Sequence, residues 1–373
     1  MSAGLRSLIQ NLCLASVSAA VVPIGAELYL RASGFAAPRF RDTARIANGR
    51  RSVMLDCYPE NPGGYFDIDL RDPATLDRYL RLGVTRAAAV AQRAPFAVEF
   101  KYNALRYRDV EFGARRPGVR RVLVLGDSFT EGWGVKEKDT YPRRLEALLN
   151  REEPNGWEVL NCGRRGADFP GLFDLFEQVE ALEPDVLVYG MVLNDAARSA
   201  AYEARQPYLN DWILNQGQMV GGRPVPPLGP LRSRLLMFAR DRIESRRIDR
   251  ASTRWYRELY AEPNADGWAR TQGYLREMNR RMRVCGRALL VACWPLLVDL
   301  NGDYPFAAAH EAIARACLPS GIPFHDLRVA LRVRPTESLW VHAVDRHPNA
   351  AAHELAARDL APVVRGLAPP PGR

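Results

Sequence analysis

The sequence has very little lysine. Lysine occurs only at positions 101, 136 and 138, so arginine supplies nearly all of the 52 basic residues, which outnumber the 43 acidic residues and give a net charge of +9. The basic residues are scattered among acidic ones, as in the stretch Arg240 to Arg250, which is typical of a solvated helix face rather than of a nucleic-acid groove. We attribute the arginine excess to composition bias and expect no nucleic-acid partner.

Paired cysteine motifs are also absent. The six cysteines, at positions 13, 57, 162, 285, 293 and 317, show neither C-x-x-C spacing nor the density of a disulfide scaffold. We therefore expect no metal site. Cys162, Cys285 and Cys293 lie in or beside apolar runs and are predicted to be buried thiols. One disulfide stays open as an alternative if the protein is exported.

Long hydrophobic runs are missing, apart from a weak one near the start. Ser7 to Ala26 are 20 consecutive uncharged residues, enough to cross a bilayer as a helix, although Pro23 and several polar residues dilute them. A cleaved signal segment and a buried helix of a soluble protein are alternatives. We favour an uncleaved inner-membrane anchor at residues 1–30, with the rest of the chain periplasmic or extracellular, or secreted if the segment is cleaved.

The composition of 47% hydrophobic and 25% charged residues over 373 positions excludes disorder and multi-span membrane proteins. Residues 31–117 show little periodicity but carry an aromatic, Pro/Gly-rich stretch from Cys57 to Phe66. We interpret 31–117 as a lead segment packed on a main domain at 118–369.

Short apolar runs alternate with amphipathic stretches throughout residues 118–369. The predicted strands are Arg121–Leu125, Glu158–Asn161, Val186–Tyr189, Ala288–Trp294 and Ile322–His325, and the predicted helices are 141–150, 171–183, 266–284, 304–317 and 350–365. This alternation predicts an α/β fold with a parallel sheet, whose ligands bind at the carboxyl ends of the strands. A long insertion at 196–265 could be a lid, one wall of a substrate cleft, or a surface insertion.

Three predicted strands end in residues that carry chemistry. The first runs into a tight Gly-Asp-Ser turn that would expose the hydroxyl of Ser128, where a nucleophile must be to meet a carbonyl. The second ends in a loop containing Gly163 and Gly166, whose backbone can approach a ligand. The third ends at Asn194, a neutral amide donor. Each feature alone is also typical of an ordinary turn or helix cap.

A serine hydroxyl needs a base to become a nucleophile, and an imidazole held by a carboxylate is the usual one. Among five histidines, positions 310, 325 and 353 fall in predicted helices or strands, where packing explains them. His347 lies on a predicted loop, two residues after Asp345 and before a Pro-Asn helix start. It is the best candidate base.

This order of motifs resembles the SGNH/GDSL hydrolase superfamily, including membrane-anchored bacterial members, over about residues 118–369. The resemblance implies a flavodoxin-like α/β/α sandwich that cleaves or transfers esters without a cofactor. It implies Ser128 as nucleophile, His347 as general base and Asp345 as orienting acid. The implied oxyanion donors are the backbone N–H groups of Ser128 and Gly166 and the side-chain amide of Asn194. Gly166 is preferred to Gly163 because of its spacing from Asn161.

Two departures from the family pattern concern the candidate site residues. Three residues separate Gly190 from Asn194, so we assign Gly190 no role, and only one residue separates Asp345 from His347. We predict a serine esterase or deacylase acting on an acylated envelope glycan or lipid. An O-acyltransferase with a sugar hydroxyl as acceptor, and a non-catalytic carbohydrate- or lipid-binding module, are the alternatives.

Overall fold

The computed structural model describes residues 3–33, 98, 100–204, 219–220, 223–224, 233–342 and 345–370. The chain divides into two compact units, one made of Met1–Pro95 and Pro207–Ala251 and the other of Phe96–Gln206 and Ser252–Arg373. The aromatic stretch from Cys57 to Phe66 lies outside the described residues.

The larger unit contains a five-stranded sheet, and every neighbouring pair of its strands is parallel. The strands are β1 (Arg120–Gly126), β2 (Trp157–Gly163), β3 (Val186–Met191), β6 (Ala288–Cys293) and β7 (Phe324–Asp326). Their spatial order, β2-β1-β3-β6-β7, is the flavodoxin-like order with its reversal beside β1. The predicted α/β fold with a parallel sheet is confirmed.

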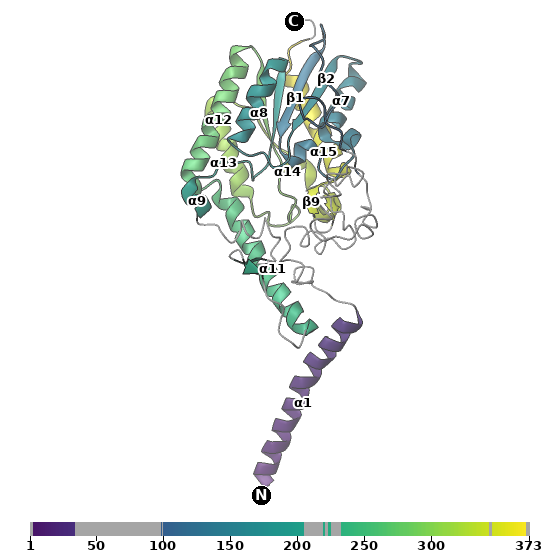
Figure 1. Ribbon diagram of the computed structural model, residues 1–373, viewed down its shortest axis with the longest axis vertical. Coiled ribbons are helices and arrows are strands. Elements are labelled where there is room, and N and C mark those ends of the chain that lie inside the picture. The colour runs from purple at the N-terminus through teal and green to yellow at the C-terminus, as the bar shows by residue number, and fades with distance from the viewer. Residues whose placement is uncertain are drawn as a thin grey trace. The chain divides into compact units, whose positions relative to one another are not determined.

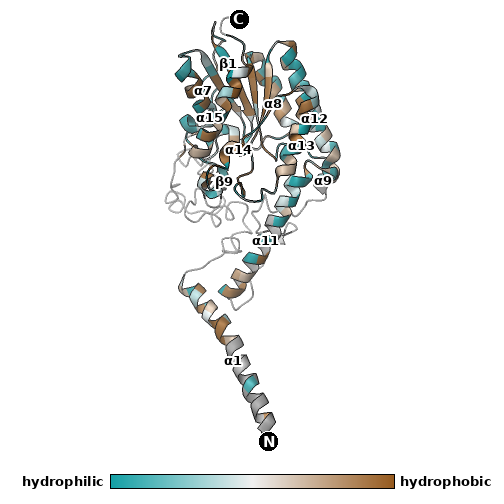
Figure 2. Ribbon diagram, turned by 180° about the vertical axis from the view of Figure 1, so that it is seen from behind, coloured by the Kyte–Doolittle hydropathy of each residue, from teal (hydrophilic) through white to brown (hydrophobic). Residues whose placement is uncertain are grey.

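Helices cover both faces of this sheet (Figure 1). On one face lie α8 (Gly171–Val179), α12 (Ala265–Val284) and α13 (Ala307–Cys317), and on the other α7 (Tyr141–Glu152) and α15 (Ala350–Leu367). Because both faces are covered, β1 is buried along its whole length, and its residues from Val122 to Leu125 form a continuous apolar run. The strands are accordingly among the most hydrophobic parts of the chain (Figure 2).

Three glycines lie in register at the carboxyl edge of the sheet. Gly126 pairs with Gly163 on one side and with Gly190 on the other. A Cβ atom at Gly163 would lie 2.2 Å from the backbone nitrogen of Glu131, and one at Gly126 would lie 2.2 Å from the Thr130 hydroxyl. The glycines therefore leave room for the short helix α6 (Ser128–Glu131), which follows β1 directly.

The hairpin of β8 (Trp340–His342) and β9 (Asp345–Pro348) lies outside the sheet and precedes α15. Its strands are antiparallel, with Trp340 paired to Pro348. The sequence predicted a loop here, so the short strands are a correction. Asn349 caps α15 by accepting hydrogen bonds from the backbone N–H groups of Ala351 and Ala352 at 3.0 and 3.2 Å.

The smaller unit contains α1 (Ala3–Ala32) and most of α11 (Arg234–Glu258), which extends into the larger unit. The Glu27 carboxylate caps α11 by accepting hydrogen bonds from the backbone of Arg234 and Leu235 and from the Ser233 hydroxyl. These bonds, led by that from Leu235, lower the pKa of Glu27 to about 2. Within the described residues no helix is long and apolar enough to span a membrane, so the predicted transmembrane segment is not supported.

The insertion at 196–265 contributes α9 (Ala200–Ala204), the strand pair β4 (Met219–Val220) and β5 (Arg223–Pro224), and α11. Its role as lid, cleft wall or surface insertion stays a prediction.

One prediction about the cysteines is wrong. Cys162 and Cys293 are buried as expected, but Cys285 is exposed, because it is the C-cap residue of α12 and precedes the strand rather than belonging to it. The described cysteines 162, 285, 293 and 317 are all free thiols.

Candidate active site

Ser128 is the first residue of α6, two positions after β1 ends at Gly126. Asp127 caps this helix, since its Oδ1 accepts a hydrogen bond from the backbone N–H of Phe129 at 2.8 Å. The backbone N–H groups of the first helical turn have no partner within the helix. The fold therefore holds the Ser128 hydroxyl and its own N–H together at the carboxyl edge of the sheet.

His347 lies beside this serine. Its Nε2 is 3.0 Å from Ser128 Oγ, within hydrogen-bond distance. The imidazole packs against two aromatic rings, with centroid distances of 5.4 Å to Phe129 and 6.1 Å to Trp133. A nucleophile and a base within hydrogen-bond reach are the geometric requirement for transferring the serine proton during attack on a carbonyl.

Asp345 begins β9, the strand that also carries His347. The pairing of β9 with β8 shifts register between Trp340 and His342, so the regular alternation of strand faces does not apply between positions 345 and 347. The side chain of Asp345 lies outside the described part of the chain.

Asn194 follows β3 and faces the same edge. Its Nδ2 lies 3.4 Å from Asp127 Oδ2, which is also 3.4 Å from Ser128 Oγ. The Asp127 carboxylate thus connects the predicted nucleophile with the predicted side-chain oxyanion donor. Asp127 is almost completely buried, and this burial raises the pKa of its carboxyl group.

Gly166 lies in a turn after β2. The turn is closed by a hydrogen bond from the Ala167 N–H to the Arg164 carbonyl at 3.1 Å, and Gly166 has φ = 73°. Arg165 is not among the described residues with positive φ, so the turn is of type II, which requires a positive φ at its third residue. By contrast, Gly163 belongs to the close approach of β2 to α6.

Three further histidines whose side chains are described have packing partners, as predicted for them. Buried His310 in α13 lies 3.0 Å from Asp326 and 3.1 Å from the Tyr304 hydroxyl. His325 in β7 lies 2.6 Å from an oxygen of Asp359. His353 is fully buried in α15, and burial lowers its pKa to about 3.

Several residues around α6, the helix that begins with Ser128, were not predicted from the sequence. Arg108, which is 1% exposed, donates to the carbonyls of Glu131, Gly132 and Val135, the last two at 2.5 and 2.7 Å. It therefore caps the carboxyl end of α6. Burial lowers the pKa of Arg108 to about 10.

Glu131, which ends α6, forms a second set of contacts. Its Oε2 lies 2.9 Å from Nε of Arg165, and its Oε1 accepts a hydrogen bond from the Tyr102 hydroxyl at 2.8 Å. No sequence signal predicts these pairings, because they join segments 29 to 34 positions apart and charged residues in loops are usually solvated.

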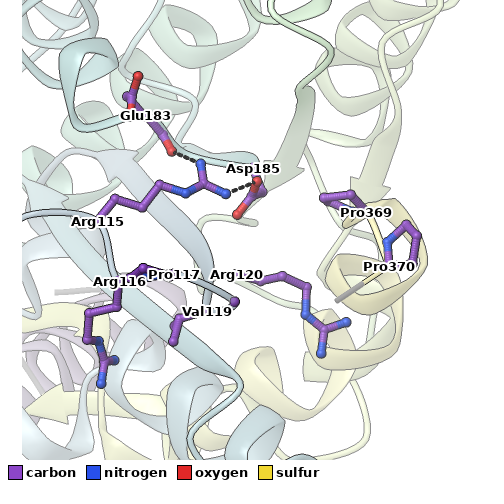
Figure 3. Close-up of a pocket in the computed structure, with 10 residues that line it drawn as sticks. Arg115, Arg116, Pro117, Val119, Arg120, Glu183, Asp185, Pro369 and Pro370 are labelled. Carbon is purple, nitrogen blue, oxygen red and sulfur yellow. Dashed lines mark hydrogen bonds and ion pairs between the residues drawn. The ribbon is translucent and has the colours of Figure 1, made fainter. Parts of the chain in front are cut away.

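A cavity of about 310 Å³ lies at the opposite edge of the sheet, near the start of β1 and β3. Arg115 reaches between the Glu183 carbonyl and the Asp185 carboxylate there, at 2.7 and 2.6 Å (Figure 3). This cavity is separate from the Ser128–His347 pair. Among the described side chains there is no group of three or more His, Cys, Asp or Glu residues that could hold a metal ion.

The fold and the serine–histidine pair define an α/β protein in which a serine hydroxyl and an imidazole are in contact at the carboxyl edge of the sheet. The model of the GDSL-like lipase/acylhydrolase family matches residues 124–355. The chain belongs to this family, within the SGNH/GDSL superfamily of ester-hydrolysing enzymes.

Comparison with curated proteins gave no match. Solved structures with a similar fold include the psychrotrophic esterase EstA from Pseudoalteromonas sp., with 11% identity, 66% of this chain and 97% of that chain covered, and a TM-score of 0.38. A catalytic mutant of Axe2, an acetylxylan esterase from Geobacillus stearothermophilus, has 14% identity, 66% and 94% coverage and a TM-score of 0.39. Both TM-scores are below 0.5, so the family assignment depends on the sequence model.

Proposed function

We propose that the protein is a serine-dependent ester hydrolase. Ser128 attacks the ester carbonyl while His347 takes its proton and then gives it to the leaving alkoxide. Water releases the acyl group by the same route in reverse. The observation that carries the proposal is the 3.0 Å separation of Ser128 Oγ and His347 Nε2.

Asp345 is the proposed orienting acid. In the neutral imidazole that accepts the serine proton at Nε2, the hydrogen is on Nδ1, and a carboxylate there would hold this tautomer. The place of Asp345 on the same short strand as His347, two residues before it, supports this role. Asp345→Asn should lower kcat, and an unchanged kcat would mean that another group orients His347.

The proposed oxyanion donors are the N–H of Ser128, the N–H of Gly166 and Nδ2 of Asn194. Three donors suit a tetrahedral intermediate, because each preorganised hydrogen bond strengthens as the charge develops. The assignment of Ser128 and Asn194 as donors is supported by their proximity to the same Asp127 carboxylate oxygen. The assignment of Gly166 is supported by the positive φ of this residue in its turn.

The first experiment is hydrolysis of short aryl esters by the wild-type chain, with Ser128→Ala and His347→Ala as variants. We expect both variants to fold and to lose turnover. His325→Ala is a matched control, because His325 is paired with Asp359 away from Ser128. A Ser128→Ala protein with full activity would contradict the mechanism.

The proposed substrate is an acylated glycan or lipid of the cell envelope, and transfer to a sugar hydroxyl is the alternative outcome with the same residues. A screen of acetylated sugars, lysolipids and aryl esters, with and without an added acceptor hydroxyl, separates the two. Free acid as the only acyl product in the presence of acceptor supports hydrolysis. Formation of an acylated acceptor supports transfer.

We also propose that the catalytic unit acts outside the cytoplasm, held at the membrane by the N-terminal segment. The basis is the uncharged stretch from Ser7 to Ala26 after Arg6. Alkaline phosphatase fused after position 33 should be active in intact cells if residues 1–33 direct export. An inactive fusion would contradict this localisation.

A further inference from the structure

The N–H of Gly166 belongs to the peptide bond between Arg165 and Gly166, so its direction depends on how that peptide is held. In a type II turn this central peptide is rotated by roughly half a turn relative to a type I turn. The alternative rotation would present the Arg165 carbonyl where the N–H now lies. A carbonyl oxygen there would repel an oxyanion instead of stabilising it.

Arg165 is fixed on several sides. Its Nε donates to Glu131 Oε2 at 2.9 Å, and its guanidinium also hydrogen-bonds to the Tyr102 hydroxyl. The guanidinium carbon lies 4.5 Å from the ring centroid of Trp133 and 4.6 Å from that of Phe100. A planar guanidinium suits this combination of ring stacking and directed hydrogen bonds better than an ammonium group does.

The partner of Arg165 is attached to the nucleophile. The side chain of Glu131 is only 2% exposed, and Glu131 ends the four-residue helix that Ser128 begins. Both carboxylate oxygens of Glu131 are engaged, one by Arg165 and the other by Tyr102. The pair therefore joins the nucleophile helix to the turn that carries Gly166.

We propose that Arg165 is a positioning residue that holds the Arg165–Gly166 peptide with its N–H toward the oxyanion, through its ion pair with Glu131 and its stacking on Trp133 and Phe100. This inference rests on the proposed function, since it assigns the arginine to the oxyanion hole of that site. Arg165 acts through Gly166 and Glu131 and does not itself touch the substrate.

The test compares four variants in the aryl-ester assay. Arg165→Ala removes the ion pair with Glu131 and the stacking on Trp133 and Phe100. Arg165→Lys keeps the positive charge but loses the planar guanidinium group. Glu131→Gln with Arg165→Met removes both charges, so that no buried charge is left unpaired if the single variant fails to fold. Arg164→Ala is the matched control, because the Arg164 guanidinium lies 5.1 Å from the Tyr107 ring centroid and takes no part in the contacts of Arg165.

We expect Arg165→Ala and the double variant to lower kcat about 10- to 100-fold with KM within about threefold, and Arg165→Lys to be intermediate. Arg164→Ala should stay within about twofold of wild type. The pH midpoint of kcat should not move, because the base is unchanged. An unchanged kcat, or a loss confined to KM, would overturn the proposal; the latter would mean that Arg165 contacts substrate.

Covalent labelling of Ser128 by a fluorophosphonate, followed by mass spectrometry, distinguishes failure of the proposed function from failure of the positioning role of Arg165. This reaction also develops charge on an oxygen in the oxyanion hole, so its rate should fall in the Arg165 variants. If the wild-type serine is not labelled and no ester is cleaved, the proposed function fails. If wild type and the Arg165 variants are labelled equally fast, only the positioning role fails.

Discussion

Ser128 Oγ and His347 Nε2 lie 3.0 Å apart although 219 positions separate them in the chain. The two side chains reach this contact by different means. Ser128 is held by β1, an internal strand of the sheet, and by α6, which begins at Ser128, whereas His347 lies on a two-stranded hairpin outside the main sheet. The position of Ser128 is therefore fixed by the main sheet and α6, whereas the position of His347 depends on how the β8–β9 hairpin is anchored.

Replacing Asn194 by alanine should lower kcat without unfolding the protein. The amide Nδ2 of Asn194 lies beside Asp127 at the edge of the sheet, and loss of one oxyanion donor typically lowers kcat about 100- to 1,000-fold. Asn194→Asp should be worse, because a second carboxylate would face Asp127 and the developing oxyanion. Steady-state kinetics with urea unfolding as the control tests both. An Asn194→Ala enzyme with wild-type kcat would remove Asn194 from the oxyanion hole.

We assigned Gly190 no role from the sequence, yet in the structure a side chain at this position would clash with its neighbours. A Cβ atom there would lie 2.2 Å from the Tyr141 hydroxyl and 2.7 Å from the Thr130 hydroxyl. We expect Gly190→Ala to lower the free energy of unfolding by about 1–3 kcal/mol, as overpacking does. Adding Tyr141→Phe should recover part of this loss by removing the nearer oxygen.

The control for Gly190 is Gly171, at the start of α8, where an added Cβ would meet no atom within 4 Å. Gly171→Ala should leave the free energy of unfolding unchanged or slightly raised. Urea titrations of the three variants measure these differences. Equal stability of Gly190→Ala and wild type would contradict the packing argument.

The ends of the first three strands could be predicted from the sequence because each predicted run is short, apolar and followed by a turn. Parallel strands bring their carboxyl ends to one edge of the sheet. This reasoning placed Ser128, Gly166 and Asn194 at the same edge. The sequence was insufficient for Arg108 and Arg165, whose partners belong to distant segments. Cys285 was misjudged for a related reason, since apolar neighbours do not reveal which residue ends the helix.

Asn349 should link catalysis to the anchoring of the hairpin. Its Nδ2 donates to the carbonyls of Ser338 and Trp340 at 2.9 and 3.0 Å, while its Oδ1 caps α15. Asn349→Asp keeps the cap but loses both donated bonds, so we expect about 1–2 kcal/mol lower stability and a reduced kcat. Asn349→Ala also loses the cap, which should cost about 1 kcal/mol more.

Kinetics and urea unfolding of the two Asn349 variants test whether the hairpin positions His347. The informative comparison is kcat at a temperature where both variants remain folded. If Asn349→Asp and Asn349→Ala lose stability but keep wild-type kcat, then these two bonds do not position the histidine.

His353 should make stability depend on pH. It is fully buried, its Nδ1 accepts a hydrogen bond from the Tyr141 N–H at 3.1 Å, and burial lowers its pKa from 6.5 to about 3. Between these two values the unfolded chain binds a proton that the folded chain does not. The contribution of His353 to the free energy of unfolding is therefore fully present above pH 6.5 and is lost as the pH falls toward 3, by at most about 1.4 kcal/mol per pH unit.

His353→Gln isolates this effect, because the glutamine carbonyl can accept the same bond but the side chain does not titrate. From pH 7 to pH 5, the free energy of unfolding of wild type should fall by about 2 kcal/mol more than that of the variant. Urea unfolding at the two pH values measures the difference. Parallel losses in both proteins would mean that His353 takes up a proton in the folded state, and that its burial between Tyr141 and Trp294 does not keep it neutral.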